Sequence, residues 1–104
     1  MSTVRIYEVI DAGKLRGWLM KSMSKLGITT LDKLKDDQQV EHLARLTYKQ
    51  LPLVPFRSAI KCTIGEKGFH KLVFMIRDKM ISSGSLDLSW LSVSEIKSML
   101  SGVI

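Results

Sequence analysis

Apolar residues recur along this chain at the spacing of an α-helix, and this spacing restricts the possible folds more than any other feature. The clearest segment is 69–82, where five apolar residues follow one another at intervals of one, three or four. They are Phe69, Leu72, Val73, Ile76 and Met80. Residues at these intervals lie on one face of a helix and predict that this face is buried in a core.

The same segment carries a second apolar stripe. Phe74 and Ile81 lie seven residues apart, about a third of a turn away from the first stripe. A helix with two stripes is either central in the fold or covered on one side by a partner. The segment after the loop at 82–85 offers four apolar residues that can fold back over this second stripe: Leu86, Leu88, Trp90 and Leu91.

Shorter stretches show the same spacing. Three leucines and one methionine predict a helix over 14–26 that begins after Asp11 and ends at Gly27. Capping residues and prolines predict further helices over 31–34, 37–51, 55–64, 69–82 and 93–101. Segment 4–10 fits both a helix and a strand, and we favour the helix. With 104 residues and no repeat or linker, the chain is expected to be all-α, a single compact bundle of five or six short helices, with residues 1–104 forming one helical domain.

The net charge of +6 comes from one third of the sequence. Between His42 and Arg77 there are seven basic residues and one acid, Glu66, whereas the bases and acids elsewhere cancel. This concentration predicts a surface that meets something anionic. The candidate residues for binding nucleic acid or another anion are Arg45, Lys49, Arg57, Lys61, Gly65, Lys67, Gly68 and Lys71.

A second basic stripe lies in the first predicted helix, where Lys14, Lys21 and Lys25 share one face and Trp18 lies at its border. Lysines beside an aromatic ring suit contacts with phosphates and bases. The same pattern is also typical of the solvated face of an amphipathic helix.

The segment Ile64-Gly65-Glu66-Lys67-Gly68 joins two predicted helices. It resembles the loop of KH domains, in which an Ile-Gly-x-x-Gly turn clamps a nucleic-acid backbone. The resemblance covers about 54–72 and implies that this turn contacts phosphates. The strands of a KH domain are not predicted around it, and Gly65 also fits the C-terminal end of an ordinary helix.

No arrangement of catalytic or metal-binding residues is recognisable. Cys62, His42 and His70 have neither the spacing of a nucleophile motif nor that of a zinc site. We therefore expect a protein that is not an enzyme, with no catalytic residue, metal or cofactor. The single cysteine suits a reducing compartment, the N-terminus does not resemble a signal peptide, and no stretch is apolar enough to span a membrane. The expected location is cytoplasmic.

Two functions follow as hypotheses. The first is a non-enzymatic protein-interaction module that presents a basic and partly apolar helical surface to a protein partner or to a second copy of itself. Its candidate contact residues are Trp18, Phe74 and Ile81, and six methionines suit adaptable apolar contacts. The alternative is a nucleic-acid-binding protein that contacts phosphates through the basic region 42–77 and the Gly65–Gly68 turn.

Overall fold

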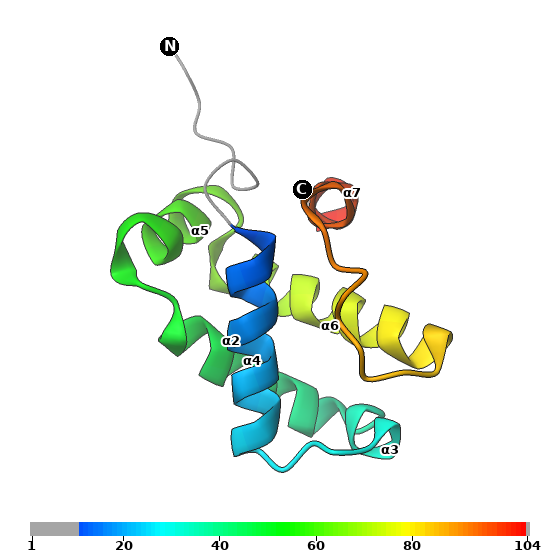
Figure 1. The fold of residues 1–104 in the computed structure, drawn as a ribbon. Coiled ribbons are helices and arrows are strands. Elements are labelled where there is room, and N and C mark those ends of the chain that lie inside the picture. Colours follow the sequence, from blue (N-terminus) through cyan, green and yellow to red (C-terminus); the bar gives the residue numbers. More distant parts are fainter. Residues whose placement is uncertain (1–10, 104) are drawn as a thin grey trace.

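Helices make up most of the part of the chain that the structure describes, residues 11–103 of a computed structural model, and no strand occurs among these residues (Figure 1). The prediction of an all-α bundle is confirmed. The segment 4–10, for which helix and strand both remained open, lies outside the described residues. The helices are α2 (Ala12–Lys25), α3 (Leu31–Leu34), α4 (Asp37–Gln50), α5 (Ser58–Thr63), α6 (Gly65–Ser83) and α7 (Val93–Val103), and a single wide turn, η1 (Leu53–Arg57), precedes α5.

The helix starts and ends follow from side chains close by in the sequence. Asp11 accepts hydrogen bonds from the backbone N–H of Gly13 at 2.8 Å and of Lys14 at 3.2 Å, which satisfies two free donors of α2. Asp36 does the same for α4 by accepting from the N–H of Gln38 at 3.0 Å. At the end of α6, Gly84 adopts a φ of 73°, a left-handed conformation that glycine reaches without strain.

Helix α6 is longer than its sequence pattern indicated. It begins at Gly65, whereas the apolar spacing predicted a start at Phe69. Gly65 has a φ of 71° and turns the chain from α5 into α6 within one residue. Gly68 is a buried residue inside the first turns of α6, so it does not open the helix as expected. Packing of this first turn outweighs the low helix propensity of its two glycines.

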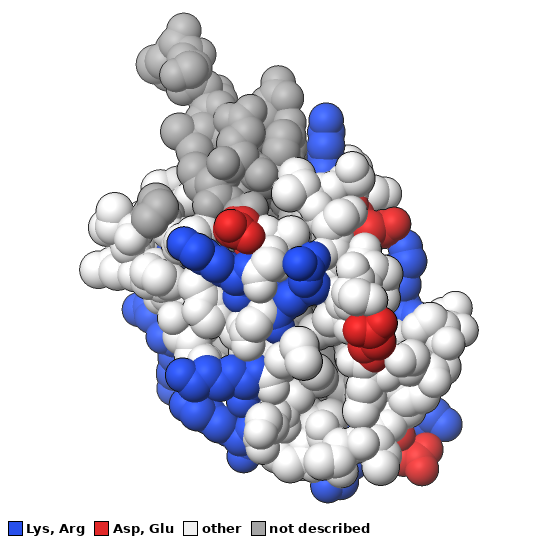
Figure 2. Space-filling model, viewed as in Figure 1, with Lys and Arg blue, Asp and Glu red and all other residues white. Residues whose placement is uncertain are grey.

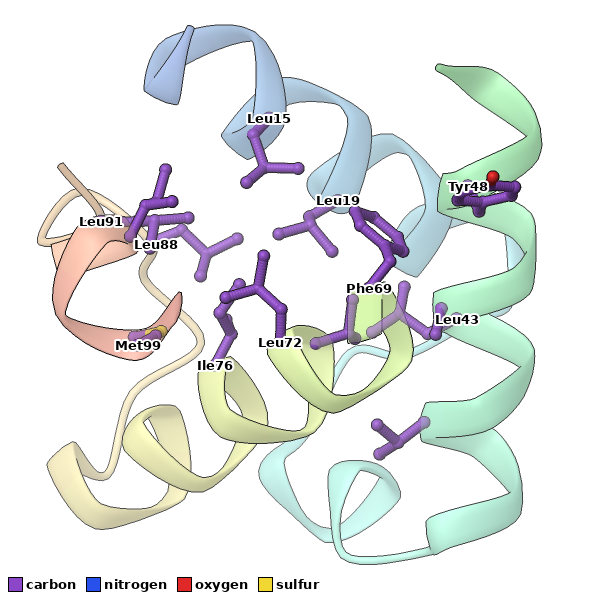
Figure 3. Packing of buried hydrophobic residues seen from close by; sticks show 14 of the residues in the cluster. Leu15, Leu19, Leu43, Tyr48, Phe69, Leu72, Ile76, Leu88, Leu91 and Met99 are labelled. Atoms are coloured by element: carbon purple, nitrogen blue, oxygen red, sulfur yellow. The ribbon is translucent and has the colours of Figure 1, made fainter. Parts of the chain in front are cut away.

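The core lies between α2, α4 and α6. Leu15 and Leu19 of α2 point towards Leu72 and Ile76 of α6, and all four are buried (Figure 3). The rings of Tyr48 of α4 and Phe69 lie with their centres 5.5 Å apart. Figure 3 shows both residues. Helix α6 packs against α3, α4, α5 and α7, so the expectation that it is central is confirmed.

The connection between α6 and α7 contributes to this core. Leu88 lies with Leu19 and Met23 of α2 and with Ile76 of α6, and Leu91 is completely buried near it. The guanidinium of Arg16 donates to the carbonyl of Leu91 and holds this connection against α2. Leu88, one of the four residues considered for the second stripe of α6, thus lies beside its first stripe, at Val73, Ile76 and Met80.

Candidate interaction surface

The basic residues between His42 and Arg77 divide into those that already have partners and those that do not. Arg45 forms an ion pair with Glu41, one turn earlier on α4, at 3.2 Å. Arg77 donates to Asp37 at 2.9 Å and to Asp78 at 2.7 Å. Burial alone would lower the pKa of Arg77, but the hydrogen bonds to these two carboxylates raise it above the ordinary arginine value. Its charge is therefore permanent and locally neutralised.

Arg57 has a structural role at the end of α4. Its guanidinium donates to the carbonyl of Lys49 at 2.7 Å and of Leu51 at 3.0 Å, and it lies over the ring of Tyr48, 5.8 Å from the ring centre. These carbonyls are among the last of α4 and its following residue, where a helix has unpaired acceptors. The side chain of Arg57 thus closes the end of α4 and joins it to η1.

Four lysines of the region are exposed and form no ion pair with any described residue: Lys49, Lys61, Lys67 and Lys71. Lys67 and Lys71 lie one turn apart on α6, so both ammonium groups stand on the same face of that helix. The unpaired positive charge of the predicted surface is therefore carried by these four side chains.

The outward face of α6 forms the floor of a shallow groove. The groove has a volume of about 500 Å³. Glu41 of α4 stands on one side and Gly102 of α7 on the other. The full lining is Glu41, Lys67, His70, Lys71, Phe74, Met75 and Gly102. We call this the α4–α6–α7 groove. It combines an apolar floor, made by Phe74 and Met75, with two lysines that form no ion pair with the residues described in the structure.

His70 lies at the Glu41 side of the groove and is mostly buried. Its side chain is 18 % exposed, and its Nε2 atom is buried without a hydrogen-bond partner among the described residues. The nearest carboxylate oxygen, on Glu66 one turn earlier, is 3.9 Å away, beyond hydrogen-bond distance. A buried nitrogen without a partner is costly to the fold.

The Gly65–Gly68 turn differs from the loop of a KH domain. Gly65 to Gly68 form the first turn of α6, and only Glu66 and Lys67 of this turn are exposed. No strand flanks it within the described residues. The resemblance therefore ends at the five-residue sequence and does not extend to the fold. Lys67 is the residue of this turn that reaches the groove.

The three residues predicted for protein contact do not lie together. Trp18 packs edge-on against Phe56 of η1 with the ring centres 5.2 Å apart, which leaves it partly buried between α2 and η1. Phe74 lines the groove, and Arg77 lies over its ring at 5.1 Å. Ile81 is partly buried against the core two turns further along α6. Of the three, Phe74 alone belongs to the groove.

Sequence reasoning missed Glu41, Met75 and Gly102 as groove residues. Met75 follows Phe74 directly, so the second apolar stripe was the available signal for it. Glu41 and Gly102 reach the groove only because α4 and α7 pack on either side of α6. Nothing local in the sequence indicates that packing.

Three further features were considered in residues 11–103: metal-binding clusters, the cysteine thiol and membrane-spanning helices. No group of three or more histidine, cysteine, aspartate or glutamate side chains among these residues is placed to hold a metal ion. Cys62 is an exposed free thiol. None of the described helices has the length and apolar character needed to cross a membrane.

Comparison of the chain with protein-family models, with curated proteins and with solved structures finds no match.

Proposed function

We propose that this protein is a non-enzymatic interaction module that binds an acidic, partly apolar segment of a protein partner in the α4–α6–α7 groove. The observation that carries this proposal is the combination of Phe74 and Met75 on the floor with unpaired Lys67 and Lys71 beside them. Apolar side chains of a partner would bury the floor, and its carboxylates would pair with the lysines.

The spacing of the two lysines supports a helical or extended acidic segment. Lys67 and Lys71 are one helical turn apart, a rise of about 6 Å. Carboxylates four residues apart on a helix, or two apart on a strand, repeat at a similar distance. An apolar residue between them would face Phe74.

The test uses a labelled amphipathic peptide with glutamates at intervals of four and leucines on the same face, measured by fluorescence anisotropy against the full chain. A peptide with the same composition in scrambled order is the control. We expect the ordered peptide to bind more tightly. Lys67→Glu with Lys71→Glu should weaken that binding at least tenfold, because two attractive pairs become repulsive.

The chain offers a matched control variant. Lys21 and Lys25 are also exposed, one turn apart and without ion pairs among the described residues, but they lie on α2. Lys21→Glu with Lys25→Glu makes the same change in net charge away from the groove. If both double variants weaken peptide binding equally, the groove is not the binding site and the proposal fails.

A second candidate function is nucleic-acid binding through the four unpaired lysines. It is supported by their exposure and by the single acid between His42 and Arg77. A labelled 20-nucleotide DNA distinguishes it from the first. Retention that falls steeply between about 50 and 200 mM salt and is lost in the Lys67/Lys71 variant would favour nucleic acid. Phe74→Ser separates the two, since it removes apolar floor without changing charge.

The protein segment bound in the α4–α6–α7 groove can also belong to a second copy of this chain. If the chain sediments as a dimer at micromolar concentration and Phe74→Ser makes it a monomer, the occupant of the groove is a second copy. A monomer that binds the acidic peptide assigns the groove to a different protein.

A further inference from the structure

The most exposed large apolar side chains of the described residues are neighbours in the sequence. Leu53 is 64 % exposed and Val54 is 73 % exposed. Both belong to η1, between α4 and α5, and Pro52 and Pro55 flank them in the sequence. Single exposed apolar residues are ordinary, but two adjacent ones on one turn form a small continuous apolar tip. We call Leu53 and Val54 the apolar tip.

The apolar tip is held in place by hydrogen bonds on both sides. The N–H of Arg57 donates to the carbonyl of Pro52 at 2.9 Å, and the hydroxyl of Ser58 donates to the carbonyl of Leu53 at 2.7 Å. Val54 is extended, with φ of −126° and ψ of 131°, as expected for a residue that precedes a proline. The two side chains are therefore presented by an ordered turn.

The interior anchor of this turn is Phe56. It is buried, packs against Trp18, and has Lys14 Nζ 5.7 Å from its ring centre. The turn is thus attached to α2 by an aromatic contact and to α4 by Arg57. Neither contact covers Leu53 or Val54, so their exposure is part of the folded arrangement.

Basic residues flank the apolar tip in the sequence. No aspartate or glutamate occurs between Glu41 and Glu66 in the sequence. Lys49 lies at the last turn of α4, and Lys61 lies in α5 on the other side of η1; both are exposed without ion pairs to described residues. Figure 2 shows lysine and arginine side chains on one face of the molecule.

The position of η1 at the edge of the fold limits what the apolar tip can bind. In Figure 1 the η1–α5 unit forms the outer edge of the molecule beyond α2 and α4. The α4–α6–α7 groove is lined by other residues altogether. Two exposed apolar side chains do not enclose a ligand. They can, however, enter the interface of a lipid bilayer, which has an apolar interior and can have an anionic surface. Lysines around such a tip then lie at the level of the anionic head groups.

We propose that the apolar tip inserts into the head-group region of an anionic lipid bilayer, with Lys49 and Lys61 contacting the lipid phosphates. The binding is peripheral, with the protein lying on the surface. Two independent contributions supply the free energy of binding. One is the burial of Leu53 and Val54, and the other is the attraction of the flanking lysines to anionic lipid head groups. Both contributions are needed, since either alone gives weak and reversible attachment.

Flotation of the full chain with vesicles tests this proposal. One set of vesicles is phosphatidylcholine alone, and the other contains phosphatidylcholine and phosphatidylserine at about 7:3. We expect binding to the second set only. Leu53→Ser with Val54→Ser should reduce binding at least tenfold, because the serines forfeit burial of several methyl and methylene groups. Lys49→Gln with Lys61→Gln should reduce it roughly tenfold or more.

Met20→Ser is the matched control for the tip. Met20 is 57 % exposed, but it lies on α2 and not on η1. Its variant should bind the anionic vesicles as the native chain does, and far-UV circular dichroism should be unchanged for all variants. Equal binding by the tip variant and the native chain overturns the proposal, as does equal binding to neutral and anionic vesicles. Retention on a 20-nucleotide DNA that is lost with Lys49 and Lys61, in the absence of vesicle binding, would assign the lysines to nucleic acid instead.

Discussion

The guanidinium of Arg77 lies 2.9 Å from the carboxylate of Asp37, forty residues earlier in the chain. The same guanidinium group donates to the carbonyl of Leu34, also at 2.9 Å. One side chain of α6 therefore joins the end of α3 to the first residue of α4. It also covers one face of Phe74, so it links the middle of the fold to the floor of the groove.

Replacing Arg77 should destabilise the fold. Its side chain is only 12 % exposed, and Arg77→Ala leaves the Leu34 carbonyl without its partner. We expect the free energy of unfolding in urea to fall by about 1–3 kcal/mol. Lys35→Ala, which removes an exposed pair with Asp32, should cost less than about 0.5 kcal/mol. Equal losses for the two variants would show that Arg77 does not join these elements.

Two glycines should respond to alanine in opposite directions. Gly84 has a φ of 73°, so Gly84→Ala places a Cβ in the left-handed region and should destabilise by about 1–2 kcal/mol. Gly17 lies inside α2, and a Cβ there meets nothing within 4 Å. Gly17→Ala should stabilise by about 0.5–1 kcal/mol through better helix propensity. Thermal unfolding of both variants measures whether each change in stability is positive or negative. A change in the same direction for both would contradict the helix boundaries described above.

Leu72 and Leu53 differ in burial, so their replacement should affect stability differently. Leu72 is completely buried between α2 and α6, and Leu72→Ala should destabilise by about 2–5 kcal/mol through the cavity it leaves. Leu53→Ala at the apolar tip should change stability by less than about 0.5 kcal/mol. Denaturant unfolding measures both. A large loss at Leu53 would mean that the tip is structural, which would count against its role at a membrane.

Asp87 gives a prediction about pH. The hydroxyl and the backbone N–H of Ser89 both donate to its carboxylate, at 2.5 and 3.0 Å, and they lower the pKa of Asp87 below the ordinary aspartate value. A lowered folded pKa means that the folded state favours the carboxylate. The resulting stabilisation is present above the ordinary pKa and is lost as the pH falls through the lowered one. Carboxyl chemical shifts followed by pH titration should show a low midpoint for Asp87 that rises in Ser89→Ala; an unchanged midpoint would rule out the hydroxyl as the cause.

The local boundaries of the helices were predictable because they depend on neighbouring residues. Asp11 and Asp36 accept hydrogen bonds from N–H groups two or three residues later, and Gly84 ends α6 by its own backbone freedom. The start of α6 was not predictable in the same way. Gly65 and Gly68 normally weaken a helix, and here the first turn forms because it packs against the rest of the bundle.

The candidate site also has features that the sequence predicts and features that only the packing of helices produces. Lys67, Lys71 and Phe74 could be recognised from the sequence, Lys71 and Phe74 by charge and helical spacing and Lys67 by its place in the Gly65–Gly68 turn. The groove itself could not, because its walls come from α4 and α7. The sequence also counted Arg45, Arg57 and Arg77 as free positive charges. Arg45 pairs with Glu41 one turn earlier on the same helix, which is a local contact. Arg57 and Arg77 find their partners through the fold, Arg57 at the end of α4 and Arg77 at Leu34 and Asp37.

By itself, then, the sequence determined an all-α fold, the positions of most helix ends and the excess of positive charge between His42 and Arg77. These properties arise from spacing and from interactions across a few residues. The tertiary structure alone decided which charges remain unpaired, where Phe74 meets a groove, and that Leu53 and Val54 stay outside the core. Those outcomes depend on how α4, α6 and α7 pack together, and packing between distant segments leaves no periodic signal in the chain.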